Sequence, residues 1–330
     1  MEKANFTLGV DVSRNTLDIY CIEVKQHIQV TNNAIGFKAI KTFCKVNEID
    51  LLNTLIVLEY TGGYEYRFIQ FCESKNISYV RVPGLEIKRS MGIVRGKSDK
   101  IDSKRIAQYG DEKYKQLTPG KPINKGILEL KMLLSFRKKL IRENAGYKSM
   151  MKERKHMYEV NNRDVVITIL NKKQKENEKA IEVVEQNIER LILCESSLLK
   201  NYELLKSIRG IGNVNAWMTL AYTENFTSFN NARSYAVYVG VIPFEYSSGI
   251  SIRGRKRVSK IANKELKQEL NQAAKSAIQW DKELNAYATK KLENKHYGVV
   301  LNNVKFKLIL RMFSVVKRGE KYIDNYCKAA

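Results

Sequence analysis

Histidine is scarce in this 330-residue chain: His27, His156 and His296 lie far from one another and from the five cysteines. The cysteines are also widely spaced and form no Cys-x-x-Cys motif. This pattern predicts reduced, mostly buried thiols in a cytoplasmic protein, and it argues against a disulfide framework. Without grouped His or Cys ligands a zinc site is not expected, so any metal ion would be held by oxygen atoms.

Acidic residues are too few to balance the basic ones. The chain has 58 lysines and arginines against 35 aspartates and glutamates, a formal net charge of +23. It contains no apolar run of about 18 residues and no signal peptide, so we expect neither a membrane span nor export. Such an excess of positive charge indicates a polyanionic partner, most simply nucleic acid, with an anionic membrane surface as the competing alternative.

The first hundred residues alternate between short apolar strands and amphipathic helices. Three strands come first, and helix, strand, helix and strand follow, which is the order of a ribonuclease H-like α/β fold. The expected strands are 6–12, 17–24, 27–30, 54–59 and 78–83, and the expected helices are 33–46 and 64–73. Pro119 and Pro122 mark a linker, so we assign residues 1–120 to this domain.

Four acidic residues occupy positions where they can converge. Asp11 and Glu59 stand at the carboxyl ends of central strands, where open α/β sheets place their sites. Asp99 and Asp102 are three residues apart at the start of a helix-like run, and this spacing puts both on one helix face. Because that helix follows the last strand, it can lean over the same sheet edge. We therefore expect an oxygen-only site for Mg²⁺ or Mn²⁺, ions that can stabilise phosphodiester cleavage.

Basic residues surround the Asp99–Asp102 segment. They either neutralise the acidic pair or hold a polyanion against it: Lys97, Lys100, Lys104 and Arg105. Acids in a first helical turn also suit the helix dipole, so the segment taken alone is more often an ordinary solvated helix start. The upstream acids favour the metal site.

The middle segment, residues 121–203, has helical periodicity and contains no proline after Pro122. A basic helix with an apolar seam is followed by a break at 161–164. Apolar residues then alternate spacings of three and four for over three heptads, with Glu195 at one seam position, which indicates a coiled coil. Two long helices joined near residue 165 would either fold back on each other as an arm or pair with another subunit.

The last segment, residues 204–330, begins with a Gly-x-Gly turn between two expected helices. Glycines allow backbone N–H groups to approach a phosphate, as in helix-hairpin-helix modules, so Arg209, Gly210 and Gly212 are candidate nucleic-acid contacts. A plain corner between helices without a ligand remains an equal alternative. The segment ends in an expected basic amphipathic helix.

A Ser247-Ser248-Gly249 turn lies further on and is followed by a basic cluster of Arg253, Arg255, Lys256, Arg257 and Lys260. A hydroxyl beside five cations is well placed to meet a phosphodiester. Attack of a serine on phosphorus would give a phosphoserine link that conserves the bond for rejoining. By itself, a Ser-Ser-Gly sequence is more often a surface turn.

These motifs resemble those of the DEDD transposases and recombinases of the insertion-sequence-110 group. The N-terminal blocks are Gly9-Val10-Asp11-Val12-Ser13, Glu59-Tyr60-Thr61-Gly62-Gly63-Tyr64 and Gly96-Lys97-Ser98-Asp99-Lys100-Ile101-Asp102. Ser98 and Ser103 depart mildly from the usual third block. The C-terminal pattern matches at Gly240, Pro243, Ser248-Gly249, Asn263 and Ala273-Ala274. Counting four residues after Pro243 assigns the family's nucleophile to Ser248, and Ser247 is the neighbouring alternative.

The resemblance implies a RuvC-like catalytic domain, a coiled-coil arm and a C-terminal transposase domain. Asp11, Glu59, Asp99 and Asp102 would bind Mg²⁺ or Mn²⁺, and Ser248 would attack DNA to form a covalent 5′-phosphoserine intermediate. Donor and target double-stranded DNA would be the substrates, and a structured guide RNA would select them. The arm would form a homodimer or higher oligomer, with the acids of one subunit meeting the serine of another.

Two other functions compete with this interpretation. A metal-dependent, structure-specific endonuclease would use the same acids with water as the nucleophile, and it would leave free ends and no protein–DNA adduct. A non-catalytic architectural protein would bind nucleic acid through its charge alone, so Asp99→Ala and Ser248→Ala would not change its binding.

Overall fold

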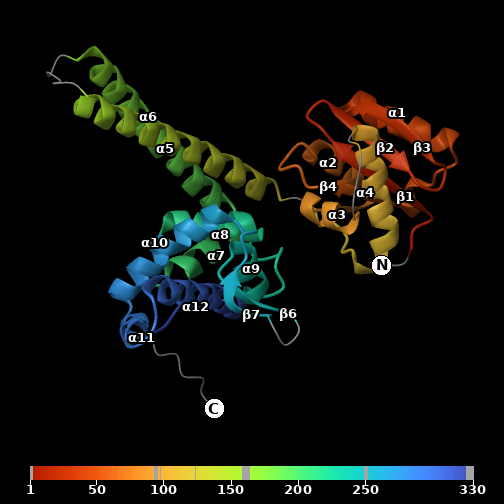
Figure 1. Ribbon diagram of the computed structural model, residues 1–330. Coiled ribbons are helices and arrows are strands. Elements are labelled where there is room, and N and C mark those ends of the chain that lie inside the picture. Colours follow the sequence, from red (N-terminus) through yellow and green to blue (C-terminus); the bar gives the residue numbers. More distant parts are fainter. Residues whose placement is uncertain are drawn as a thin grey trace. The chain divides into compact units, whose positions relative to one another are not determined.

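The computed structural model describes residues 3–92, 96, 98–122, 124–157, 164–248 and 252–324, with the side chains of 246–248, 252, 253 and 255 left aside. The chain forms two compact units, Met1–Ile123 and Asn124–Ala330 (Figure 1). Each unit has its own hydrophobic core. The expected division into residues 1–120, 121–203 and 204–330 stays a prediction. No described helix is long and apolar enough to cross a membrane.

A five-stranded mixed sheet with the order β3-β2-β1-β4-β5 organises the first unit. Strand β1 pairs antiparallel with β2 and parallel with β4, while β3 and β5 form the edges. The strands are β1 (Phe6–Val12), β2 (Thr16–Cys21), β3 (Gln26–Thr31), β4 (Thr54–Glu59) and β5 (Ser78–Val82). All five expected strands are present, which confirms a mixed α/β unit consistent with a ribonuclease H-like domain.

Helices cover both faces of this sheet. They are α1 (Ala34–Val46), α2 (Tyr66–Ser74), α3 (Gly84–Ser90) and α4 (Asp99–Lys113), with short 3₁₀ helices at Leu51–Asn53 and Tyr114–Gln116. Ile40 of α1 and Phe68 of α2 pack in one core, and Ile87 of α3 and Ile106 of α4 pack in another on the opposite face. The expected helices at 33–46 and 64–73 are observed as α1 and α2, whereas α3 had no periodicity to indicate it.

The second unit is mainly helical. Its elements are α5 (Lys125–Met157), α6 (Val165–Cys194), α7 (Ser196–Lys206), α8 (Asn213–Thr223), α9 (Ala232–Val239), β6 (Pro243–Ser248), β7 (Ile252–Val258), α10 (Lys264–Trp280), α11 (Lys282–Leu292) and α12 (Tyr297–Arg318). Helices α5 and α6 lie along each other as a long hairpin (Figure 1). An ion pair between Arg137 and Glu185, with Nε and Oε1 2.7 Å apart, joins them. The fold-back alternative is therefore the one observed within the chain.

The coiled-coil seam expected after the break at 161–164 does not lie on one continuous helix. Helix α6 ends at Cys194 and α7 begins at Ser196, because Glu195 between them is extended (φ −118°, ψ 102°). Its carboxylate accepts a hydrogen bond from the side-chain amide of Asn124, just before α5. Leu198, beyond the break, packs in the core of the second unit. The expectation of an uninterrupted heptad helix was wrong because the charged seam residue Glu195 hydrogen-bonds to Asn124 outside the helix and does not continue the seam.

Candidate functional site

The two strand acids face the same side of the sheet because side chains alternate along a strand. In β1, Val10 packs in the core with α1 and α2, so its neighbour Asp11 faces α4. In β4, Val57 packs in the core with α4, and Glu59 shares its face because it lies two residues further on. The predicted placement at the carboxyl ends of β1 and β4 therefore also puts the two acids on one side.

Close packing of α4 on β1 adds the other two acids. A Cβ added at Gly9 would overlap the backbone of Ser103 and Ala107, so only glycine lets the helix come this near. Glycine within a strand often marks such an approach of another backbone. The first turn of α4, which carries Asp99 and Asp102, is thereby held over the end of β1.

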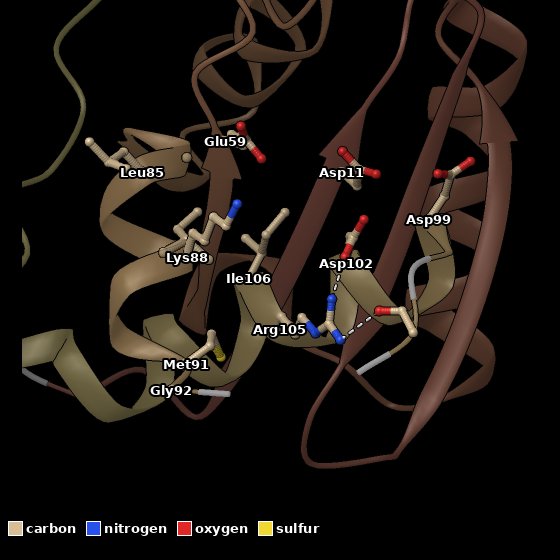
Figure 2. Close-up of a pocket in the computed structure, with 13 residues that line it drawn as sticks. Asp11, Glu59, Leu85, Lys88, Met91, Gly92, Asp99, Asp102, Arg105 and Ile106 are labelled. Carbon is tan, nitrogen blue, oxygen red and sulfur yellow. Dashed lines mark hydrogen bonds and ion pairs between the residues drawn. The ribbon is translucent and has the colours of Figure 1, made fainter. Parts of the chain in front are cut away.

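Three aspartates converge at this point (Figure 2). Asp11, Asp99 and Asp102 each offer a carboxylate oxygen, and these oxygens lie within 4.8 Å of one another. The side chain of Ser98 caps α4, which fixes both helical aspartates in its first turn. Glu59 lines the same pocket of about 750 Å³ but lies outside this tight group. The structure thus gathers three of the predicted ligands and places the fourth on the wall of their pocket.

The local field raises the pKa of Asp11 to about 6. Burial is the main cause, and the charges of Asp99, Asp102 and Glu59 add to it. The guanidinium of Arg105 lies 2.9 Å from Asp102 and offsets part of this charge. Grouped carboxylates with little neutralisation repel one another strongly, and hard divalent cations prefer such oxygen donors. The residues present therefore fit a divalent metal ion.

The basic residues predicted around α4 have different surroundings. Lys97 lies outside the described residues, and Lys100 is exposed. The ammonium of Lys104 sits 5.7 Å from the centre of the Tyr20 ring. Arg105 holds Asp102 and also donates to the carbonyl of Gly96 at 3.1 Å. Arg105 thus acts on the acidic group itself, which sequence reasoning had left as one of two alternatives.

A buried asparagine that the sequence gave no reason to single out supports the site. Asn32 donates to the carbonyl of Ser13 at 3.1 Å and to that of Tyr64 at 2.9 Å. These carbonyls belong to the loops that follow β1 and β4, the strands of Asp11 and Glu59. By tying the loops together, Asn32 fixes the spacing of the strand ends.

Asp18 is a further acid beside the site. It pairs with Asp11 in the register of β1 and β2, is 4% exposed, and contributes to the raised pKa of Asp11. Its carboxylate accepts one hydrogen bond from the side-chain amide of Gln29 at 3.0 Å and lies 2.9 Å from the ring nitrogen of His27. The sequence could have indicated this residue, because Asp18 lies between apolar neighbours in β2, which imply that the strand is buried there.

The Gly-x-Gly turn joins α7 and α8 as predicted. Gly210 has φ +90°, and a Cβ there would lie 2.7 Å from the carbonyl of Ala273 in α10, so this glycine has a packing role. Gly212 precedes α8, and a Cβ added there would meet nothing within 4 Å. Arg209 is paired with Asp324 at 2.8 Å. Open backbone at Gly212 is the feature that best matches a phosphate contact.

Ser248 ends strand β6 and is paired with Ile252 of β7. Its side chain and that of Ser247 are not described, and Gly249 lies outside the described residues. Most of the predicted basic cluster lies on β7, where Lys256 is ion-paired with Glu245 of β6. The remaining described cations of the cluster are exposed: Arg257 and Lys260.

Comparison with known proteins extends these observations over most of the chain. The family model DEDD_Tnp_IS110, described as "Transposase", matches residues 8–154, and the model described as "Transposase IS116/IS110/IS902 family" matches residues 202–289. The pilin gene-inverting proteins of Moraxella lacunata and Moraxella bovis are each 27% identical to this chain over 273 residues. The matched region covers 80% of this chain and 80% of each relative.

The two family models match in chain order, and the first spans the whole acidic site. Membership of this family implies DNA binding and a divalent metal ion, for which the grouped aspartates provide suitable ligands. The chain belongs to the insertion-sequence-110 family of transposases and is a DNA-recombining enzyme.

Proposed function

We propose that this enzyme cleaves and rejoins DNA through a covalent serine intermediate at a Mg²⁺ site formed by Asp11, Glu59, Asp99 and Asp102. The observation that carries the proposal is the convergence of three carboxylates within 4.8 Å, in a pocket also lined by Glu59. A bound Mg²⁺ would stabilise charge on the phosphoryl oxygens of a DNA strand. Arg105 would keep Asp102 oriented toward that ion.

Ser248 is the proposed nucleophile. Its Oγ would bond to the phosphorus as the P–O3′ bond breaks, and its proton would leave to a base while the 3′-oxygen takes up a proton. The DNA 5′-phosphate would then be esterified to the serine. Attack of a 3′-hydroxyl on this ester would reverse the bond changes and rejoin DNA without an external energy source.

The wider organisation belongs to the same proposal. Residues 1–120 would form the RuvC-like catalytic domain, 121–203 the arm that joins subunits, and 204–330 the domain that carries Ser248. The relatives' names describe inversion of a pilin gene, so inversion stands beside insertion among the products to test. A structured guide RNA would select donor and target DNA, while Lys and Arg side chains hold their backbones.

The test is to incubate the protein with DNA from the end of the insertion sequence, the candidate guide RNA and Mg²⁺, and to look for a protein–DNA adduct that resists denaturation. We expect the adduct with the unaltered protein and with Ser247→Ala, and none with Ser248→Ala. Asp11→Asn should abolish the adduct but leave RNA binding intact, because it removes a metal ligand and no phosphate contact. An adduct that persists in Ser248→Ala would assign the nucleophile elsewhere.

A hydrolytic endonuclease is the second candidate. The observation that favours it is that all four acids lie in the first unit, so the acidic pocket forms without any residue of the second. This alternative predicts metal-dependent cleavage with free 5′-phosphate ends in both Ser247→Ala and Ser248→Ala. Recovery of such ends without any adduct would replace the recombinase mechanism by this one.

A further inference from the structure

The pocket of the acidic site has a second wall that the proposed chemistry does not use. This wall is formed by α3 and the residues that follow it, with one contribution from α4: Leu85, Ile87, Lys88, Met91 and Ile106. In Figure 2 the amino group of Lys88 points into the space below Glu59, and Leu85 projects from α3 away from the three aspartates. The pocket therefore combines an acidic side with a mainly apolar side that carries one lysine.

Two apolar side chains of this wall are accessible to a ligand, Leu85 and Met91, whereas Ile87 and Ile106 are buried. Leu85 is 44% exposed although it lies in a concave site. Single exposed apolar residues are ordinary on protein surfaces. Here, however, Leu85 shares the pocket with Met91 and Ile106, and a concave apolar surface beside a few polar groups is typical of a binding site.

Lys88 is the second distinctive group. It is exposed, and within the described part of the chain it has neither an ion-pair nor a hydrogen-bond partner. The other cation of the pocket, Arg105, is held by Asp102. Lys88 is thus available to meet an anionic group of a ligand.

A nucleotide has the same division of properties as this pocket. Its phosphate is anionic, and its sugar and base present largely apolar surfaces. The volume of about 750 Å³ lies within the usual range for sites that enclose small ligands. The carboxylates alone would repel a phosphate, so the adjoining lysine provides complementary charge.

We propose that the α3 wall binds the nucleotide next to the phosphodiester held at the acids. Lys88 contacts a phosphate oxygen, while Leu85 and Met91 pack against the sugar and base. This inference rests on the proposed function and adds a binding subsite to it. The residues position the DNA strand and do not touch the reacting atoms. Apolar packing accepts any base, so the wall holds the strand without selecting sequence.

The first experiment measures binding of a fluorescent 12-nucleotide oligothymidine in Ca²⁺ to the full chain. Lys88→Met and Leu85→Ala should each weaken binding by about five- to twentyfold, the effect of losing one phosphate or base contact. Lys45→Met is the matched control, because Lys45 is an exposed lysine of α1 on the opposite face of the sheet. Its binding should stay within about twofold of that of the unaltered protein, since only general charge is lost.

A second oligomer separates the two contacts. In a 12-unit chain of abasic deoxyribose phosphates, the effect of Lys88→Met should persist because the phosphates remain. The effect of Leu85→Ala should largely disappear because the base is gone, which is the non-additivity expected of directly interacting groups. An undiminished effect of Leu85→Ala on the abasic oligomer would overturn the assignment of Leu85 to the base.

Metal binding distinguishes failure of this inference from failure of the proposed function. Mn²⁺ should raise the unfolding temperature of Lys88→Met and Leu85→Ala as much as that of the unaltered protein, but not that of Asp99→Asn. If both wall variants bind oligothymidine as Lys45→Met does while Asp99→Asn loses the Mn²⁺ response, the wall proposal is wrong and the metal site stands. If Asp99→Asn keeps both the Mn²⁺ response and the adduct, the proposed function itself fails.

Discussion

Replacing Asp11 by asparagine should make the metal-free protein more stable while abolishing its response to divalent ions. Burial and the charges of Asp99, Asp102 and Glu59 raise the pKa of Asp11 to about 6. An aspartate in an unfolded chain titrates near 3.9. The folded protein thus resists ionisation of a side chain that the unfolded chain ionises readily.

The sign of the pH dependence follows from proton binding. Between about pH 4 and pH 6 the folded state retains a proton that the unfolded state has released, so the contribution of Asp11 to the free energy of unfolding falls as pH rises. A shift of about two units at about 1.4 kcal/mol per unit gives an upper limit near 3 kcal/mol. Because Asp11 is only half-buried, solvent screening reduces this to about 1–2 kcal/mol. Asparagine keeps the shape and removes the charge.

Urea unfolding in a chelator at pH 7.5 and pH 4 measures this difference. The free energy of unfolding of Asp11→Asn should exceed that of the unaltered protein by about 1–2 kcal/mol at pH 7.5 and equal it near pH 4. Glu112→Gln is the control, because Glu112 is an exposed acid near the other end of α4. Mn²⁺ should then stabilise the unaltered protein but not Asp11→Asn. A variant less stable than the unaltered protein at pH 7.5 in chelator would refute the reasoning.

Three further substitutions test particular packing and charge features. Burial lowers the pKa of Lys305 to about 8, so the contribution of Lys305 to the free energy of unfolding should rise between about pH 8 and 10.5, where only the unfolded chain keeps the proton. Lys305→Met should therefore raise the unfolding temperature at pH 7. A lower unfolding temperature of this variant would contradict the reasoning. A Cβ at Gly84 would overlap the carboxylate of Glu59 and force this flexible side chain to move. Gly84→Ala should therefore weaken Mn²⁺ binding by about tenfold in calorimetric titration, and unchanged affinity would contradict a role for the observed position of Glu59 in metal binding. Gly210 has φ +90°, and a Cβ added there would lie only 2.7 Å from the Cβ of Ala277. Gly210→Ala should therefore lower the free energy of unfolding in urea by roughly 2 kcal/mol. An unchanged free energy of unfolding would show that the turn can relax.

The strand acids could be predicted from sequence because their positions depend on local pattern. Short, continuous apolar strands that each end in an acid place Asp11 and Glu59 at carboxyl ends, and the observed sheet has those strands next to each other. The order of elements was sufficient to expect a mixed sheet. The helical pair Asp99 and Asp102 was equally visible, because a spacing of three fixes one helix face.

Other features depend on contacts between residues distant in the chain, so local pattern could not reveal them. Residues 84–90 are too few and too polar to show a periodic helix, so the wall with Leu85 and Lys88 was not predicted. Glu195 interrupts a convincing heptad pattern because its partner, Asn124, lies 71 residues earlier. The hydrogen bonds from Asn32 to the carbonyls of Ser13 and Tyr64 likewise join residues that are distant in the chain.

The acidic site depends in the end on a residue that has no side chain. Asp99 and Asp102 reach Asp11 only because α4 lies directly on β1, and a Cβ at Gly9 would push the helix away from Ser103 onward. That glycine lies two residues before Asp11, in the same motif. The motif therefore encodes both a candidate ligand and the space that lets the other two aspartates approach it. The +23 charge of the chain can hold DNA at many places. This packing, in contrast, concentrates negative charge at one point of the first unit, where it favours a divalent cation.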